Sequence, residues 1–451
     1  MPEATSLPPS VLKAIAGRLA GTNAALARRY PGEVGTRQPV HTVYGGAHLF
    51  TADTAQKLGR VALRALEEYA PDSEQLASAI GLADEQLAAH VHGRIFDKLR
   101  AEPVEDFRID FEDGYGVRPD AEEDGHAASV AAEVARGMRE RALPPFIGMR
   151  IKPLTEELHA RSLRTLDIFL TTLLAKGGGL PDTWVLTLPK IVHPDQAAAF
   201  ADALDALESK LGLGDGVLRF EAMVETPQLV VDAAGRSGLP ALIDAGRGRL
   251  VAAHFGTYDY TAALNITAAH QRMRHPACDF ARHVMQVAYA GTGVWLSDGS
   301  TTVMPVPVHR APADGSGLSE AQEAENRASV HRAWRLHYDD VRHSLTTGFY
   351  QGWDLHPAQL VTRYAAVYSF FLEGVEAAGA RLRNFLAKAA QATLVGDVFD
   401  DAATGQGLLN FFLRAINSGA LSEAEAGAMI DLTADELRTR SFTKILRNRG
   451  A

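Results

Sequence analysis

Isolated charged residues stand at the ends of several apolar runs in this sequence. The runs read RIDFEDG, FIGMRIKP, VLTLPKI, FEAMVETP and LVAAHFGTYDY, and the charges that end them are Asp110, Arg150, Lys190, Glu225 and Asp259. The intervals between these charges are 40, 40, 35 and 34 residues. A (β/α)₈ barrel needs roughly 31 residues per unit before insertions, and its active site lies where the C-terminal ends of the strands converge. The spacing favours a barrel with these charges at its mouth.

Two of these charges, Glu225 in MVETPQ and Asp259 in GTYDYT, follow consecutive apolar runs. Two carboxylates on adjacent strand ends can bind one Mg²⁺, with water and substrate oxygens completing the octahedron. For either residue alone the competing interpretation is a helix cap or a turn. Taken together, the pair favours a metal site.

The segment DFEDGYG supplies three carboxylates, Asp110, Glu112 and Asp113. The strand period places Asp110 and Glu112 on one face and Asp113 on the following loop. Close carboxylates repel one another unless a cation or strong donors offset them. We expect them to contact the waters around the metal ion, and the alternative is a solvated acidic turn.

Three basic residues are candidates for binding substrate. Arg150 lies in a strand too apolar for a solvated face, and a guanidinium there can hold a carboxylate or carbonyl oxygen at two points. Its structural alternative is a salt bridge to the DFED acids, and both can hold. Lys190 is placed similarly, although lysine often extends towards solvent. His356, in GWDLHPAQ, is as compatible with structural hydrogen bonding as with substrate contact.

Apolar runs and helical periodicity alternate along the chain, which is typical of parallel βαβ units. We expect a helical N-terminal extension over 1–38, with a helix from Pro9 to Arg29, a barrel over 39–362, and a helical C-terminal extension over 363–451. Residues 72–105 are predicted to be a helical insertion, 228–245 a loose helix, and 305–329 a loop that runs into a helix from Asn326 to Leu345. An open, doubly wound sheet is the alternative to the barrel.

Composition narrows the class of protein. The chain has 451 residues, of which 46% are hydrophobic and 22% charged, as in an ordinary globular protein. A net charge of −10 argues against nucleic-acid binding. The single cysteine, Cys278, excludes an internal disulfide, and no apolar stretch is long enough for a membrane span. We expect a cytoplasmic protein without a membrane or nucleic-acid partner.

At these residues the chain resembles the citrate lyase beta-subunit-like and HpcH/HpaI aldolase superfamily, whose fold is the pyruvate kinase-like, phosphoenolpyruvate-binding TIM barrel. The matching segments keep their order along the barrel: Asp110-Phe111-Glu112-Asp113, Arg150-Ile151-Lys152, Leu188-Pro189-Lys190, Glu225-Thr226, Gly256-Thr257-Tyr258-Asp259 and His356-Pro357-Ala358-Gln359. Each motif is weak alone, and six in sequence order are fairly specific.

The resemblance implies Mg²⁺, or Mn²⁺ in its place, held by Glu225 and Asp259. Substrate would contact Arg150 and the backbone near Gly256 and Thr257. The implied chemistry is reversible carbon–carbon cleavage of aldol or Claisen type through a metal-stabilised enolate. In some relatives a carboxylate from the C-terminal region of a neighbouring subunit acts as acid or base, and Asp400 and Asp401 are the candidates here. A homo-oligomer is expected as well.

Departures from the family pattern leave the substrate open. Lys152 replaces an asparagine, and His48 stands where many relatives that use thioesters carry a basic residue. A free 2-oxo acid and a hydroxyacyl thioester of coenzyme A are therefore both candidates. Two other functions remain alternatives. The first is phosphoryl transfer on a phosphoenolpyruvate-like ligand, although the sequence has no nucleotide-binding loop. The second is non-catalytic binding of a small acid.

Overall fold

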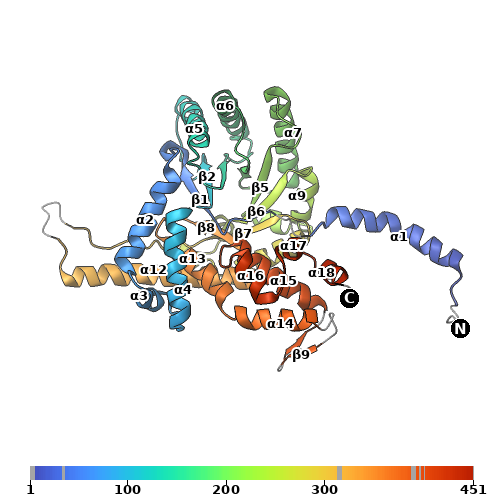
Figure 1. Cartoon of the computed structure of the whole chain (residues 1–451). Coiled ribbons are helices and arrows are strands. Elements are labelled where there is room, and N and C mark those ends of the chain that lie inside the picture. Colours follow the sequence, from blue (N-terminus) through green and yellow to red (C-terminus); the bar gives the residue numbers. More distant parts are fainter. Residues whose placement is uncertain are drawn as a thin grey trace.

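Eight parallel strands close into a barrel in which each strand pairs with the next and β8 pairs with β1 (Figure 1). The computed structural model describes residues 6–32, 36–311, 317–387, 393–395, 398–400 and 402–449. The barrel strands are β1 (His41–Gly46), β2 (Asp106–Asp110), β3 (Phe146–Arg150), β4 (Trp184–Leu188), β5 (Arg219–Val224), β6 (Leu250–Phe255), β7 (Trp295–Ser300) and β8 (Gln351–Asp354). The predicted (β/α)₈ barrel with helical extensions is confirmed.

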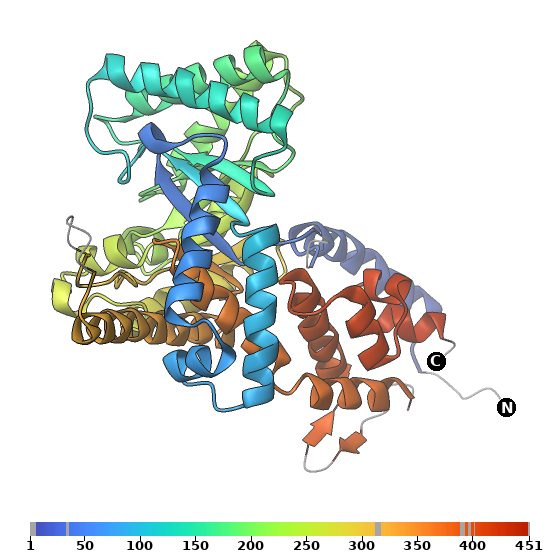
Figure 2. The ribbon, with the colours of Figure 1, turned by 60° about the vertical axis from the view of Figure 1, so that its left-hand side comes forward.

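Helices surround this barrel and extend it at both ends of the chain. They are α1 (Pro9–Arg29), α2 (Thr54–Tyr69), α3 (Ser73–Ile80), α4 (Glu85–Ala101), α5 (Asp120–Glu140), α6 (His159–Gly177), α7 (Pro194–Leu211), α8 (Pro227–Val230), α9 (Leu239–Ala245), α10 (Thr257–Ala263), α11 (Pro276–Tyr289), α12 (Glu320–Thr346), α13 (Gln359–Leu372), α14 (Val375–Ala387), α15 (Ala402–Asn417), α16 (Glu423–Ile430), α17 (Ala434–Arg438) and α18 (Phe442–Asn448). Helices α14 to α18 gather into one group beside the barrel (Figure 2).

The strand register brings the charged strand ends to one rim. Asp110 at the end of β2 is the register partner of Arg150 at the end of β3. Further round, Val224 of β5 pairs with Phe255 of β6, so that Glu225 and Gly256 leave the sheet at the same level. All of these positions follow the C-terminal ends of parallel strands, which is where barrel active sites lie.

Polar side chains fill much of the barrel interior. Arg108 donates to Glu221 over 3.2 Å and also pairs with Asp106. The hydroxyl of Tyr44 donates to the same Glu221 at 3.1 Å, and that of Thr187 does so at 2.5 Å. Unpaired charges are costly in a dry interior, and here each charged group has a partner. The same bonds link β1, β2, β4 and β5.

Three elements differ from the sequence predictions. The loose helix over 228–245 is two short helices, because Asp232 accepts the backbone N–H groups of Ala234 and Arg236 in a turn. Helix α12 begins at Glu320 instead of Asn326, since Ser319 and Gln322 form a capping box. The C-terminal region also holds the short strands β9 (Thr393–Val395) and β10 (Val398–Asp400). The boundary expected between 362 and 363 falls inside α13, and the division into three parts stays a prediction.

Helix α1 extends away from the body of the protein (Figure 1). None of its residues is buried. At its foot, Arg29 pairs with Asp244 and donates to Pro240 O at 2.9 Å, and the N–H of Gly32 donates to Gly291 O over 2.9 Å. Among the described residues, no helix has both the length and the apolar character that crossing a membrane requires.

Candidate active site at the barrel mouth

Arg150 is bound on several sides by carboxylates at the mouth. Its Nε and Nη2 donate to the two oxygens of Asp110 at 2.7 and 2.5 Å, and its Nη1 lies 3.1 Å from Glu112 Oε2. The residue is 2% exposed. The salt-bridge alternative of the sequence analysis therefore forms. Direct contact between Arg150 and a substrate stays a prediction, whereas its bonds to Asp110 and Glu112 order the acidic loop after β2.

Two aromatic rings that the sequence analysis missed lie against Arg150. Its guanidinium carbon is 4.8 Å from the ring centre of Tyr44 and 5.4 Å from that of Trp353. Cation–π contacts of this kind hold a guanidinium in place. In the sequence these two residues appear only as a tyrosine beside Gly45 and a tryptophan beside Gly352. Neither pattern predicts a contact with Arg150, because the contact depends on the pairing of β1 with β8 that closes the barrel.

Lys190 lies among four carboxylates. It has a left-handed backbone with φ of 51°, and its N–H donates to Glu225 Oε1 at 2.6 Å. Its ammonium binds Glu112, lies 3.0 Å from Asp113 Oδ2 and 3.6 Å from Asp259 Oδ2. Burial alone would lower the pKa of Lys190, but these carboxylates raise it above its usual value. The lysine remains cationic at the mouth.

Glu225 and Asp259 form the predicted acidic pair. Glu225 is 1% exposed, and burial, reinforced by the nearby Asp259, raises its pKa to about 8. The side chain of Asp259 is 44% exposed, so the pair has one buried and one solvent-facing member. Burial and Asp259 thus outweigh the nearby cations Lys190 and Arg150, which act to lower this pKa.

The donor set fits a magnesium ion. Five carboxylates at this rim (Asp110, Glu112, Asp113, Glu225 and Asp259) face only the two cations Arg150 and Lys190 among the described residues. In the part of the chain that the structure describes, no three His, Cys, Asp or Glu side chains are grouped to hold a metal by themselves. Two protein carboxylates completed by water and substrate oxygens are the usual way in which Mg²⁺ is held.

The acids after β2 are already bonded within the protein. Besides Arg150, Asp110 accepts the N–H of Glu112 at 3.0 Å and that of Gly114 at 2.7 Å. Burial raises the pKa of Glu112 in spite of Arg150 and Lys190, whereas these two cations outweigh burial at the more exposed Asp113 and lower its pKa. Contacts between these acids and waters around a metal stay predictions. They suit Glu112 and Asp113 better than Asp110, because both oxygens of Asp110 already accept bonds from Arg150 and from backbone N–H groups.

The remaining predicted site residues are more dispersed. The N–H of Gly256 donates to Val224 O at 3.0 Å, and the buried hydroxyl of Thr257 donates to the sulfur of Met273 at 3.1 Å. Both therefore have intramolecular partners, and their substrate contacts stay predictions. Asp400 is the last residue of β10, and Asp401 lies outside the described residues. Their catalytic role is likewise untested.

His356 accepts a backbone hydrogen bond just before a helix, and the same arrangement occurs a second time in the chain. Its Nδ1 accepts the N–H of Ala358 at 3.2 Å, while Gln359 Oε1 accepts the N–H groups of Leu355 and His356. The segment His193-Pro194-Asp195-Gln196 makes the same bonds before α7. The H-P-x-Q motif is thus a capping device in this protein, which favours the structural interpretation of His356.

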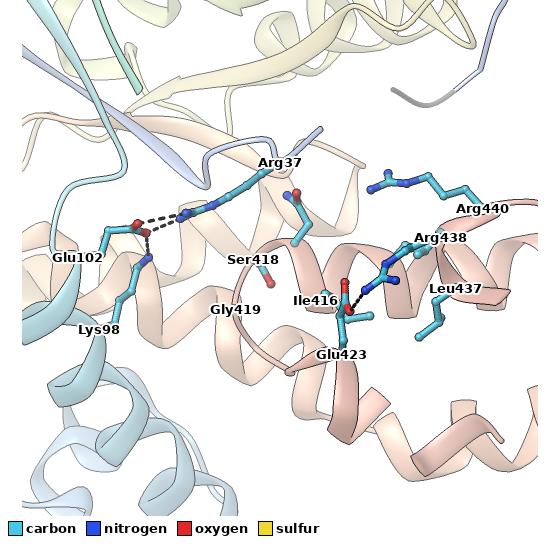
Figure 3. A pocket seen from close by; sticks show the side chains of 12 residues that line it. Arg37, Lys98, Glu102, Ile416, Ser418, Gly419, Glu423, Leu437, Arg438 and Arg440 are labelled. Atoms are coloured by element: carbon cyan, nitrogen blue, oxygen red, sulfur yellow. Dashed lines mark hydrogen bonds and ion pairs between the residues drawn. The ribbon is translucent and has the colours of Figure 1, made fainter. Parts of the chain in front are cut away.

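A cavity lies at the N-terminal face of the barrel, opposite the mouth. Its volume is about 750 Å³, and it separates Arg37, Lys98 and Glu102 from Glu423 and Arg438 of the C-terminal helices (Figure 3). Arg37 and Lys98 both pair with Glu102 and with the buried Glu105 behind it, and Arg438 pairs with Glu423. Because each of these three cations already has a carboxylate partner, we assign the cavity no ligand.

Comparison with known proteins places the chain in a family. A family model described as Domain of unknown function (DUF6986) matches residues 19–445. The chain belongs to this family. No curated protein matches it in sequence.

Solved structures share the barrel. A citrate lyase from Burkholderia xenovorans LB400 is 19% identical, with a TM-score of 0.54, over 88% of this chain and 97% of that chain. A Haloferax volcanii malate synthase lead(II) complex gives 15% identity and a TM-score of 0.46 over 74% of each chain. Its magnesium/glyoxylate complex gives 14% and 0.45 over 89% of this chain and 97% of that one. The likeness to citrate lyase confirms the predicted resemblance at the level of the fold.

Proposed function

We propose that this protein is a Mg²⁺-dependent carbon–carbon lyase of aldol or Claisen type, acting on a 2-oxo acid or a hydroxyacyl-CoA thioester. The observation that carries the proposal is the buried carboxyl of Glu225, which accepts the N–H of Lys190 and lies near Asp259 at a barrel mouth rich in carboxylates. The citrate lyase from Burkholderia xenovorans LB400, which shares the fold, belongs by its name to the same class of chemistry.

Glu225 and Asp259 would hold the ion. Bound there, Mg²⁺ would supply Lewis-acid stabilisation of the negative charge that develops when the carbon–carbon bond breaks. Lys190 adds a permanent positive charge on the same side, and its N–H fixes one oxygen of Glu225. Arg150 holds the loop that carries Glu112 through Asp110. Positive groups that are fixed before the reaction stabilise developing charge without reorganisation.

The test is a product assay with Mg²⁺ over a panel of 4-hydroxy-2-oxo acids and hydroxyacyl-CoA thioesters, recording release of pyruvate, glyoxylate or acetyl-CoA. We expect turnover with Mg²⁺, and a loss of about 100-fold or more in Glu225→Gln. Glu208→Gln, far from the mouth at the Arg249 ion pair, is the control for general loss of a buried acid. Equal turnover in wild type and Glu225→Gln would refute the metal role. Tight binding of oxo acids without turnover across the panel would refute the lyase.

A further inference from the structure

Helix α1 carries an apolar stripe that its own chain leaves uncovered. Leu12, Ile15, Leu19 and Leu26 follow one another at steps of three, four and seven residues, which places them on one face of a helix. They are between 47% and 52% exposed. A stripe of this kind normally faces another apolar surface.

The helix needs such a surface in order to be stable. Most helices in proteins owe their stability to packing of an apolar face, and Gly17 and Gly21 lower the helix propensity of α1. Within the described part of the chain, the bonds that tie α1 to the body lie at its foot, around Arg29 and the following turn. The rest of α1 has no buried residue.

The helix is also strongly basic on an acidic chain. It contains Lys13, Arg18, Arg28 and Arg29 and no acidic residue, a formal charge of +4. The rest of a chain with a net charge of −10 therefore carries −14. The body of this protein is thus an electrostatically favourable partner for the helix.

The outer layer formed by α11, α9 and α7 has the complementary chemistry. On α11, Phe280 and Val287 lie seven residues apart on one face, with exposures of 53% and 82%. Helix α9 packs against both α11 and α7, and the three helices expose the acids Asp195, Asp202 and Asp244. Asp244 of α9 and Gly291, in the turn after α11, contact the foot of α1, whereas the rest of α1 points away from the body (Figure 1).

We propose that α1 docks on the α11–α9–α7 layer of a second copy of this chain, in a closed two-fold dimer with exchanged helices. A two-fold dimer requires that both complementary surfaces lie on one chain, and here they do. A helix of 21 residues is about 30 Å long and about 10 Å wide. Two such contacts bury roughly 600 Å² per partner, most of the roughly 800 Å² of a stable interface. The body surfaces around the two helix feet supply the remainder.

The first test measures the mass of the full-length chain by light scattering after size exclusion. We expect two chains for the wild type at micromolar concentration, and one chain for Ile15→Glu/Leu19→Glu and for Phe280→Glu/Val287→Glu. Val117→Glu, a fully exposed apolar position outside both surfaces, should leave the dimer intact. Circular dichroism and thermal melting verify that each variant folds.

A second test traps the contact directly. In Leu19→Cys/Val287→Cys, oxidation should give a disulfide-linked dimer, whereas each single variant should not give this cross-link, and the native Cys278 is buried. A wild-type monomer, or an unchanged mass in either glutamate variant, would overturn the proposal. Binding of a monomer to anionic phosphatidylserine vesicles, lost in Ile15→Glu/Leu19→Glu, would show that a lipid surface covers the helix and would also overturn it.

Discussion

The carboxylate of Glu225 lies directly over the α-carbon of Gly256. A Cβ added at Gly256 would stand 2.4 Å from Glu225 Oε2 and 2.6 Å from Glu225 Cβ. The second of these atoms is fixed to the backbone of the neighbouring strand end, so it cannot move away cheaply. The glycine at the end of β6 thereby sets the position of the proposed metal ligand at the end of β5.

Gly256→Ala should therefore displace Glu225. We expect at least about tenfold weaker Mn²⁺ binding, measured by calorimetry, and a loss of stability of about 1–3 kcal/mol from overpacking. Gly179→Ala is the matched control, because nothing lies within 4 Å of a Cβ there. Unchanged Mn²⁺ affinity in Gly256→Ala would mean that Glu225 is not a ligand or that the strand ends adapt.

Lys190→Met should tighten binding of a divalent cation. The Lys190 ammonium lies 3.6 Å from Asp259 Oδ2 and competes there for the same negative charge. Removing a charge at this distance should raise Mn²⁺ affinity at least about fivefold, while turnover falls because a fixed positive charge is lost. Lys210→Met, on the exposed end of α7, provides the comparison. Weaker Mn²⁺ binding in Lys190→Met would show that the lysine organises the carboxylates more than it competes with the ion.

Arg150→Met should be severely destabilising. The change leaves Asp110 buried without its cation and Glu112 with Lys190 alone, and breaking one side of a buried pair costs about 3–5 kcal/mol. The double variant Arg150→Met/Asp110→Asn should recover part of this loss, because one unpaired charge is removed as well. Urea denaturation of the two single variants and the double variant gives the coupling energy. Additive losses would contradict the close pairing of the two residues.

His356→Ala should lower stability without changing substrate affinity. Losing the bond from the Ala358 N–H to His356 Nδ1, in the turn just before α13, should cost about 0.5–2 kcal/mol. His193→Ala, which removes the equivalent bond before α7, should behave alike. A rise in KM that is confined to His356→Ala would restore the substrate-binding role predicted from the sequence.

Two buried histidines should each contribute a loss of stability as the pH falls. Burial lowers the pKa of His41 and of His254 to about 4, from 6.5 in an unfolded chain. Between these values only the unfolded chain binds the protons, so the contribution of the two histidines to stability falls as the pH drops from about 6.5 towards 4. Each pKa unit corresponds to about 1.4 kcal/mol.

Two buried acids act in the opposite direction. Burial raises the pKa of Asp106 to about 6 and that of Glu225 to about 8, so the folded protein takes up protons there as the pH falls and gains stability. The histidine contribution is therefore measured by comparing variants. From pH 7 to pH 5 the Tm of the wild type should fall relative to that of His254→Gln, because the variant lacks one of the two groups that only the unfolded chain protonates. A difference in Tm that stays constant over this interval would contradict the assignment of a neutral, buried His254.

Much of the fold could be predicted from the sequence because each barrel strand is a short apolar run that ends in a charge. The spacing from Asp110 to Asp259 indicated the regular succession of strands, and α1 was predicted with the bounds that the structure shows. The break within 228–245 was missed because it depends on one aspartate that accepts two backbone donors. The earlier start of α12 depends on a capping box that was read as part of a loop.

The candidate site was predicted by residue type, but its pairings were not. Which carboxylate takes Arg150 depends on the register of β2 against β3, and the position of Trp353 near Tyr44 depends on closure between β8 and β1. The interior charges Asp106, Arg108 and Glu221 occupy alternate strand positions that face inwards. Their alternation along the strand is visible in the sequence. Without knowing that the barrel closes around them, however, one interprets a charged strand face as exposed to solvent.

The ion pairs inside the barrel limit which substitutions this sequence can accept. Arg108 pairs with Asp106 of its own strand β2 and with Glu221 of β5, which is far away in the chain. A neutral replacement of one of these residues therefore leaves another buried charge without its partner. We expect these positions to change only as a set in other members of the family, while the helices outside the barrel vary one residue at a time.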